Sequence, residues 1–167
     1  MKKQLTAILV LTVTCFASAF ATPVSETGSS SRKIILHTGF QKIVADGNVD
    51  VVLFENSHET QIRTFGNSAD LAATSITEEA GVLTIRNSRK KGEKVLVYVP
   101  VNQISVIEAR GNSKVSSAST LASPQLTLVV KGDCRLNIQS SGNIDVVENG
   151  DVEMVVEKKI TALKKDA

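Results

Sequence analysis

Aromatic side chains are scarce in this sequence, and tryptophan is absent. The 167 residues include five phenylalanines and one tyrosine, and Phe16 and Phe20 lie in an apolar N-terminal segment. The core must therefore be built from valine, isoleucine and leucine, which suit the narrow, layered packing of β-sheets. So few rings also disfavour a sugar-binding platform made of stacked aromatic side chains.

Residues for catalysis or metal binding are scarce too. His37 and His58 each stand alone between predicted strands, and we interpret both as exposed loop residues. The sequence has no Gly-x-Ser-x-Gly elbow, paired-cysteine motif, phosphate-binding loop or His-x-x-x-His spacing. We therefore predict no catalytic residue, no cofactor and no metal ion.

Residues 1–21 are predicted to be a signal peptide. Lys2-Lys3 precedes the apolar run Leu5–Phe16, and Ala19 and Ala21 supply the small residues that signal peptidase reads. The run is shorter than the roughly 20 residues of a membrane span. Cleavage should therefore leave an exported chain without a stable membrane span, and an uncleaved anchor is the weaker alternative.

The cysteine content excludes an intrachain disulfide in the mature chain. Cys15 lies in the predicted signal peptide, so Cys134 remains alone. Acylation of Cys15 is a weak alternative, because Thr14 stands where that signal requires a smaller residue. Cys134 takes the first apolar position after Gly132-Asp133, and we predict a small core residue rather than a reactive thiol.

Neither sign of charge dominates. Lys2 and Lys3 are two of the 19 basic residues, so the mature chain has 17 of them against 17 acidic residues. This balance argues against nucleic acid as a partner, which requires a basic patch. The basic segment Asn87–Lys94 is expected to be a solvated loop between strands. Attraction to an anionic membrane or cell-wall polymer is the alternative for it.

What the sequence does contain is a recurring glycine unit. Glycine followed by a short polar residue favours a turn that tolerates positive φ, and the alternating apolar run after it is typical of a short strand. The turn glycines are Gly47, Gly111, Gly132, Gly142 and Gly150.

The repeats predict an all-β, single-domain fold. The units leave room for one strand and one turn each, and similar residues recur at similar offsets. This pattern favours a β-solenoid or β-helix-like stack over an antiparallel meander. We expect a flexible lead-in at residues 22–32, the domain at 33–157 and a basic tail at 158–167.

The strand pattern also predicts which side chains face the core. Inward positions are Val115, Leu126, Leu128, Val130, Leu136, Ile138, Ile144, Val146, Val152, Met154 and Val156. Outward positions are Lys114, Thr127, Arg135, Asn137, Asp145 and Glu153. Apolar residues expected on the opposite face, either covered or forming a partner surface, are Val52, Phe54, Leu96, Tyr98, Val129, Val147 and Val155.

Carboxylates near the turn glycines raise the question of calcium. The acids are Asp50, Asp145, Asp151 and Glu153. Calcium binds six to eight oxygens, but the repeats lack dense Asp and Asn, and the equivalent offsets hold Lys114 and Arg135. Ordinary outward-facing strand charges are the favoured interpretation.

Several segments together resemble a known family. They are Phe40–Leu53, Gly81–Arg86, Val95–Pro100, Ile104–Gly111, Leu126–Asp133 and Gly142–Val146. Their order and spacing resemble the head GIN domain family, bacterial proteins named as candidate auto-transporter adhesins. The resemblance covers Lys33 to Glu157. It implies a β-solenoid-like domain in the periplasm or outer envelope of a Gram-negative bacterium, or a secreted one.

We therefore predict an exported cell-envelope binding or structural module, adhesin-like and without catalytic activity. Its expected partner is an envelope protein or glycan, and homo-oligomers could form through the ends of the stack. The alternative is a small β-helix enzyme acting on glycans, a lyase or hydrolase. Such an enzyme would use Asp145, Asp151, Glu153 or Arg135.

Overall fold

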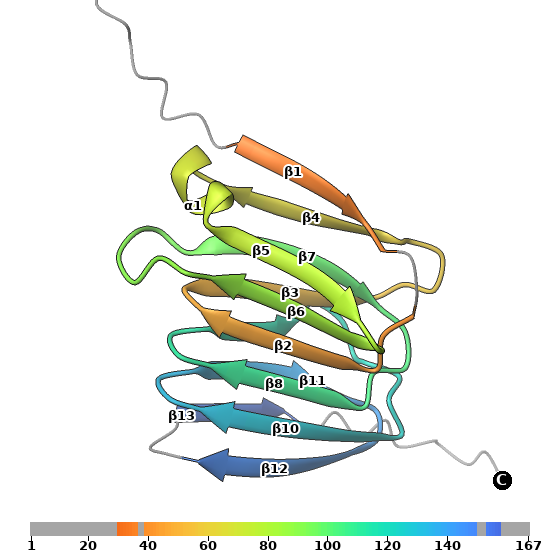
Figure 1. The fold of residues 1–167 in the computed structure, drawn as a ribbon. Helices are drawn as coiled ribbons and strands as arrows, with labels where there is room; N and C mark the ends of the chain where they lie inside the picture. Colours follow the sequence, from red (N-terminus) through yellow and green to blue (C-terminus); the bar gives the residue numbers. More distant parts are fainter. Residues whose placement is uncertain (1–29, 37–38, 150–152, 158–167) are drawn as a thin grey trace, which may run out of the picture.

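Two facing β-sheets make up the structure, a computed structural model that describes residues 30–36, 39–149 and 153–157 (Figure 1). Sheet A has seven strands in the order β1 (Ser30–Ile35), β4 (Gln61–Gly66), β7 (Val95–Val101), β3 (Val49–Glu55), β9 (Lys114–Ser117), β11 (Arg135–Gln139) and β13 (Glu153–Glu157). Sheet B has six strands in the order β12 (Asn143–Asn149), β10 (Gln125–Lys131), β8 (Val106–Arg110), β2 (Lys42–Gly47), β6 (Val82–Asn87) and β5 (Thr74–Glu79).

The chain alternates between the sheets, and each passage from sheet B to sheet A forms one rung. The rungs are β2–β3, β6–β7, β8–β9, β10–β11 and β12–β13, and their strands pair in parallel within each sheet. Leu128 pairs with Ile107 on one side and with Val146 on the other, so apolar positions stack on apolar positions. The glycine units therefore do not form the antiparallel hairpins of the meander alternative.

The order of the rungs in space differs from their order in the sequence. Lys42 of β2 pairs with Val82 of β6 on one side and with Val106 of β8 on the other. The first rung thus lies inside the stack, between two rungs that follow it in the chain. Between β3 and β6 the chain visits one end of the stack, where it forms a cap.

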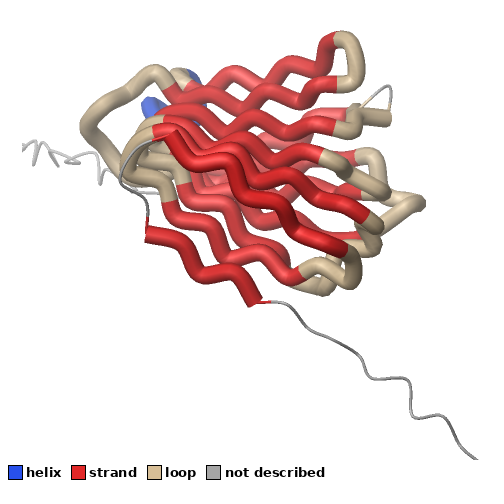
Figure 2. The backbone as a smooth tube through the Cα atoms, turned by 90° about the horizontal axis from the view of Figure 1, so that it is seen from below, coloured by secondary structure: helices blue, strands red, loops and turns tan. Residues whose placement is uncertain are grey.

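The cap consists of antiparallel strands and one short helix. Strand β4 pairs with β7 and β1, and β5 forms an antiparallel hairpin with β6 through Ala80 and Gly81. Helix α1 (Ser68–Ala72) is capped by Asn67, whose side chain accepts a hydrogen bond from Asp70 N. It is a minor exception in a molecule made almost wholly of strands (Figure 2).

The first strand begins earlier than the sequence indicated. The lead-in was expected to end at residue 32, but Ser30–Arg32 belong to β1, where Ser30 pairs with Gly66. This segment has no alternating apolar pattern, so only its hydrogen bonds to β4 make it a strand.

Aliphatic side chains fill the space between the sheets, as the composition predicted. The inward positions Val115, Leu126, Leu128, Val130, Leu136 and Ile138 are buried. Cys134 is buried beside Ser113, as expected for a core residue. Ile144 is only half-buried and Val146 is 41 % exposed, because β12 is the last described strand of sheet B. The side chains of Val152, Met154 and Val156 lie outside the described part.

The glycine turns fall at two edges rather than one. Gly47, Gly111 and Gly132 connect sheet B to sheet A and have φ of +84°, +66° and +95°. Gly142 instead connects β11 to β12 at the opposite edge, although the residues that follow it resemble those after Gly47. It has no positive φ, but a Cβ there would lie 2.2 Å from Ser123 O. Gly150 lies outside the described residues.

Candidate functional site

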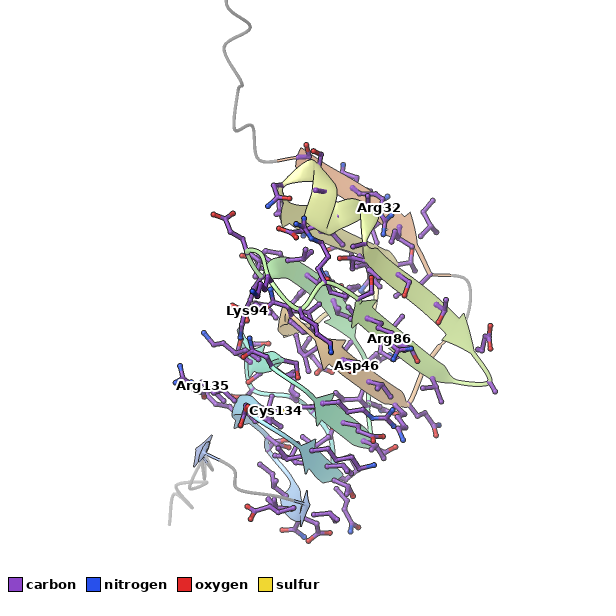
Figure 3. The ribbon with its side chains drawn as sticks, turned by 60° about the vertical axis from the view of Figure 1, so that its left-hand side comes forward. Arg32, Asp46, Arg86, Lys94, Cys134 and Arg135 are labelled. Carbon is purple, nitrogen blue, oxygen red and sulfur yellow. The ribbon has the colours of Figure 1, made fainter. Side chains whose placement is uncertain are left out.

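The edge at which sheet B strands lead into sheet A concentrates the charged side chains. We call it the glycine-turn edge, after Gly47, Gly111 and Gly132. Its basic residues are Arg86, Arg89, Lys90, Lys91, Lys94, Arg110, Lys114, Lys131 and Arg135, and its acids are Asp46, Asp50, Asp70, Glu93, Glu108 and Asp133. Figure 3 shows Lys94 and Arg135 at this edge. The connections at the opposite edge, residues 55–60, 80–81, 102–105, 118–124 and 140–142, contain no lysine or arginine.

A groove of about 550 Å³ opens at the glycine-turn edge. One wall is the loop after β6, and the other is formed by the turns after β2 and β8. Its lining residues are Asp46, Gly47, Asn48, Arg86, Asn87, Ser88, Arg89, Lys90, Gly111 and Asn112. Apart from Asp46, the lining is either cationic or uncharged.

A buried asparagine holds the start of the loop. The Asn87 side chain donates to Asp70 O at 3.3 Å and to Thr74 Oγ1 at 3.1 Å, and its Oδ1 accepts from Arg89 N at 2.8 Å. Ser88 N also donates to Ala73 O at 3.2 Å. These bonds join the loop to the end of α1 and to β5.

An ion pair and a pair of asparagines hold the rest of the loop. Asp70 is 1 % exposed, and its carboxylate lies 2.8 Å from Arg89 Nη1. On the other wall, Asn48 Nδ2 donates to Gly92 O at 3.1 Å, and Asn112 Nδ2 donates to Asn48 Oδ1 at 3.2 Å. Both walls are therefore fixed by buried or half-buried polar contacts.

The cations of the groove remain available to solvent, including Arg89, whose side chain is 41 % exposed. Arg86 Nε lies 3.2 Å from Asp46 Oδ2, yet the Arg86 side chain is 66 % exposed (Figure 3). Lys90 is exposed and forms no ion pair with any other described residue. The groove thus combines positive charge with the side-chain amide of Asn112, which donates one of its two N–H groups to Asn48.

The outer face of sheet B carries a second charged cluster, around Glu108. This residue is 2 % exposed, and its carboxylate contacts Lys42 Nζ at 2.7 Å, Arg110 Nη2 at 2.7 Å and Lys131 Nζ at 2.8 Å. Burial raises the pKa of Glu108, but hydrogen bonds from Lys131, Lys42 and Arg110 outweigh burial and lower it to about 2. The cluster joins β2, β8 and β10, which suits a structural role.

Comparison with protein families identifies the chain. Residues 39–164 match the family described as "Putative auto-transporter adhesin, head GIN domain". The chain belongs to this family. No curated protein sequence matches the chain.

Solved structures resemble this head GIN domain in fold. A putative adhesin from Parabacteroides merdae gives a TM-score of 0.62 at 23 % identity, over 78 % of this chain and 57 % of that one. A putative adhesin from Bacteroides fragilis gives 0.53 at 17 % identity, over 78 % and 75 %. A protein from Parabacteroides distasonis described as a "putative lipid binding protein" gives 0.54 at 15 % identity, over 80 % and 68 %. The chain thus spans little more than half of the first of these structures.

The residues of the glycan-enzyme alternative do not all gather at one place. Asp145 lies on β12 of sheet B and accepts a hydrogen bond from Gln125 Nε2 at 2.8 Å. Arg135 lies on β11 of sheet A, where its Cα partner is Glu153. Asp151 lies outside the described residues. The head GIN domain therefore places Arg135 and Glu153 on neighbouring strands of sheet A, and Asp145 on the opposite sheet.

The carboxylates considered for calcium are also dispersed. Asp50 lies on β3 of sheet A, where its carboxylate is 3.4 Å from Lys94 Nζ. Asp145 lies on β12 of sheet B. Within residues 30–36, 39–149 and 153–157, no three His, Cys, Asp or Glu side chains lie where they could share a metal ion. His58 is an exposed loop residue whose ring contacts Ser57 Oγ at 3.1 Å, and His37 lies outside the described part.

The outer apolar residues divide between the two sheets. Val52, Phe54, Leu96 and Tyr98 on sheet A are half-buried, and Phe65 of β4 covers Tyr98 edge-on with the ring centroids 5.8 Å apart. On sheet B, Val129 is half-buried and Val147 is 52 % exposed. Val155 lies outside the described side chains. The six residues with described side chains form no single exposed patch, because they lie on two different sheets.

Two further observations concern the remaining surface. A hollow of about 260 Å³ at the opposite edge is lined by residues including Phe40, Asn56, Glu59 and Pro100. Its acid, Glu59, is paired with Arg63 at 3.1 Å.

No helix among the described residues is long and apolar enough to cross a membrane.

Sequence reasoning missed the residues that build the groove. It identified the basic loop, but it treated Asn48 and Asn112 only as turn formers and gave Asp70 and Asn87 no role. The recurrence of asparagine directly after a turn glycine was the one available signal. This recurrence predicts a contact between the two asparagine side chains only when the two turns are known to be neighbours.

Proposed function

We propose that this head GIN domain is an adhesin-like binding module of the bacterial cell envelope, without catalytic activity of its own. The observation that carries the proposal is the groove at the glycine-turn edge. Its walls are fixed by polar contacts and its cations are exposed, but it contains no histidine or cysteine and no nucleophile beside a base. Such a lining suits recognition rather than group transfer.

The predicted signal peptide at residues 1–21 supports export of this module from the cytoplasm. Its location is the periplasm or the outer envelope of a Gram-negative bacterium, or the medium. The partner is an envelope protein or glycan, and the solved relative described as a lipid binding protein adds envelope lipids to the classes to test. The parallel rungs are in this proposal a short β-solenoid, whose stacked edges offer extended binding surfaces.

Fractionation and pull-down test the proposal. The full chain, expressed with its own leader in a Gram-negative host, is expected in the periplasmic, outer-membrane or culture fraction, shortened by cleavage after Ala21. The purified product is expected to retain a component of envelope extracts and to leave glycan and peptide libraries intact. Turnover of a library member, or retention in the cytoplasm, would contradict it.

A further inference from the structure

The groove at the glycine-turn edge has a composition that suits an anion. Arg86 and Lys90 line it from β6 and the following loop, and Asn112 adds a side-chain amide that donates one of its two N–H groups to Asn48. Asp46 is the one acid in the lining, and Arg86 Nε already pairs with it at 3.2 Å. The groove therefore carries more positive charge than its acid balances.

The donors come from separate segments of the chain. Arg86 belongs to the end of β6, Lys90 to the loop and Asn112 to the turn after Gly111, so the lining surrounds the groove from more than one side. A tetrahedral phosphate or sulfate accepts hydrogen bonds in several directions, whereas a planar carboxylate accepts them mainly in one plane. The arginine fork and the lysine ammonium are the side chains that bind such oxyanions most strongly.

The groove is also held in shape before any ligand arrives. The Asn87 side chain bonds to Asp70 O and Thr74 Oγ1, and Asn48 bonds to Gly92 O. A loop that served only to connect β6 to β7 would not need this many buried polar contacts. Preorganised donors lose less entropy on binding, which increases affinity for a ligand that fits.

We infer that the groove binds a phosphate or sulfate group carried by a component of the cell envelope. This inference rests on the proposed function and names the chemistry of its ligand. The group could belong to a lipid headgroup or to a soluble or polymeric phosphate ester, which share this recognition. Because the cations are exposed, binding should weaken as salt screens them.

A titration of the isotope-labelled mature chain, followed by NMR, tests the inference. Pyrophosphate is expected to shift the amide resonances of residues 47–48, 87–91 and 111–112 selectively. Malonate, a dicarboxylate, is expected to shift them less at equal concentration. No shifts, shifts spread over the whole glycine-turn edge, or equal shifts with malonate would overturn the assignment.

Three charge variants sharpen the test, and two of them change the charge equally. Lys90→Glu is expected to weaken pyrophosphate binding about tenfold, from the Coulomb energy of a reversed charge near the surface. Asp46→Asn is expected to strengthen binding, because it removes the only acid of the lining. Lys114→Glu is the control, because it makes the same change in charge as Lys90→Glu at an exposed position of the same edge outside the groove. It should leave the affinity for pyrophosphate unchanged. Equal effects of the two lysine variants would overturn the inference.

Vesicles distinguish the sources of the group. If pyrophosphate competes with binding to equimolar phosphatidylcholine–phosphatidylglycerol vesicles, and pure phosphatidylcholine vesicles do not bind, the source is a lipid headgroup. If neither vesicle binds while pyrophosphate does, the source is a soluble or polymeric phosphate, and both results support the site. If the Lys90→Glu variant shows no pyrophosphate shifts but still retains the envelope component in the pull-down, that component binds outside the groove. The proposed function would then stand while this inference fails.

Discussion

At the scale of single residues, Glu108 shows how a charge is kept on an outer face without exposure to water. Its carboxylate is almost completely covered, yet three cations from three neighbouring strands contact it. A buried carboxylate without partners would have a raised pKa. Here the hydrogen bonds from the three cations outweigh the effect of burial, and the pKa of Glu108 falls to about 2. The ionised form therefore stabilises the folded state.

Glu108 gives the first prediction, on pH dependence. Its folded pKa of about 2 lies below the ordinary value of 4.5, so its stabilisation is complete above about pH 4.5 and is lost as the pH falls toward 2. Glu108→Gln should lower the free energy of unfolding at pH 7 by about 2 kcal/mol, after allowance for the partly exposed cations. Urea denaturation across this pH range measures both effects. If the free energy of unfolding of the variant falls equally steeply as the pH is lowered, the loss of stability in acid belongs to other carboxylates.

Two glycines with similar backbone angles give the second prediction. Gly47 and Gly81 have φ of +84° and +74°, but a Cβ on Gly47 would lie 2.3 Å from Asn87 O, whereas a Cβ on Gly81 meets nothing within 4 Å. Gly81→Ala should cost about 1 kcal/mol, from left-handed strain alone. Gly47→Ala should cost about 3 kcal/mol, because the backbone of β6 must also move. Thermal unfolding of both variants measures the difference, and equal losses would show that the packing is not tight.

At the scale of elements, the loop after β6 depends on one side chain. Asn87→Ala removes two donated hydrogen bonds and one accepted from Arg89 N, and leaves Asp70 O and Thr74 Oγ1 without that donor. We expect a loss of about 2 kcal/mol in stability and faster amide hydrogen exchange in residues 88–94. Ser75→Ala, an exposed position of β5, is the control. Unchanged exchange in the loop would mean that the Asp70–Arg89 pair suffices to hold it.

At the scale of the whole molecule, one end of the stack is capped and the other ends at β12 and β13 among the described strands. Stability in such arrays is approximately a sum of contacts between neighbouring rungs. Native-state hydrogen exchange should therefore show protection falling from β2 and β8, through β10, to β12. Protection of β12 equal to that of β8 would indicate that another segment or a second copy covers this end.

Local patterns were sufficient for much of the fold. The alternation around Leu126, Leu128 and Val130 correctly identified the buried face. Local patterns were misleading for Gly142, because its polar neighbour and apolar run match those of Gly47 although it lies at the other edge. A short-range pattern records that the chain turns, but not toward which sheet.

The groove could not be predicted from local patterns either, because its walls come from segments that are distant in the sequence. Asn48 and Asn112 are 64 residues apart and meet because the first rung stacks directly on the third. Asp70 and Arg89 pair because the chain passes through the cap before it returns to β6. The sequence indicated the basic character of the loop, but not the wall opposite to it.

The sequence by itself determined that the chain is all-β, that aliphatic residues form its core, and that turns recur at glycines followed by asparagine or aspartate. These properties follow from side-chain volume, alternation and backbone freedom, which act over a few residues. Only the tertiary structure decided the order of the rungs, the edge to which each glycine belongs, and the groove between the loop and the turns. Those depend on long-range strand pairing, where many registers satisfy the same local pattern and the packing of the whole core selects one.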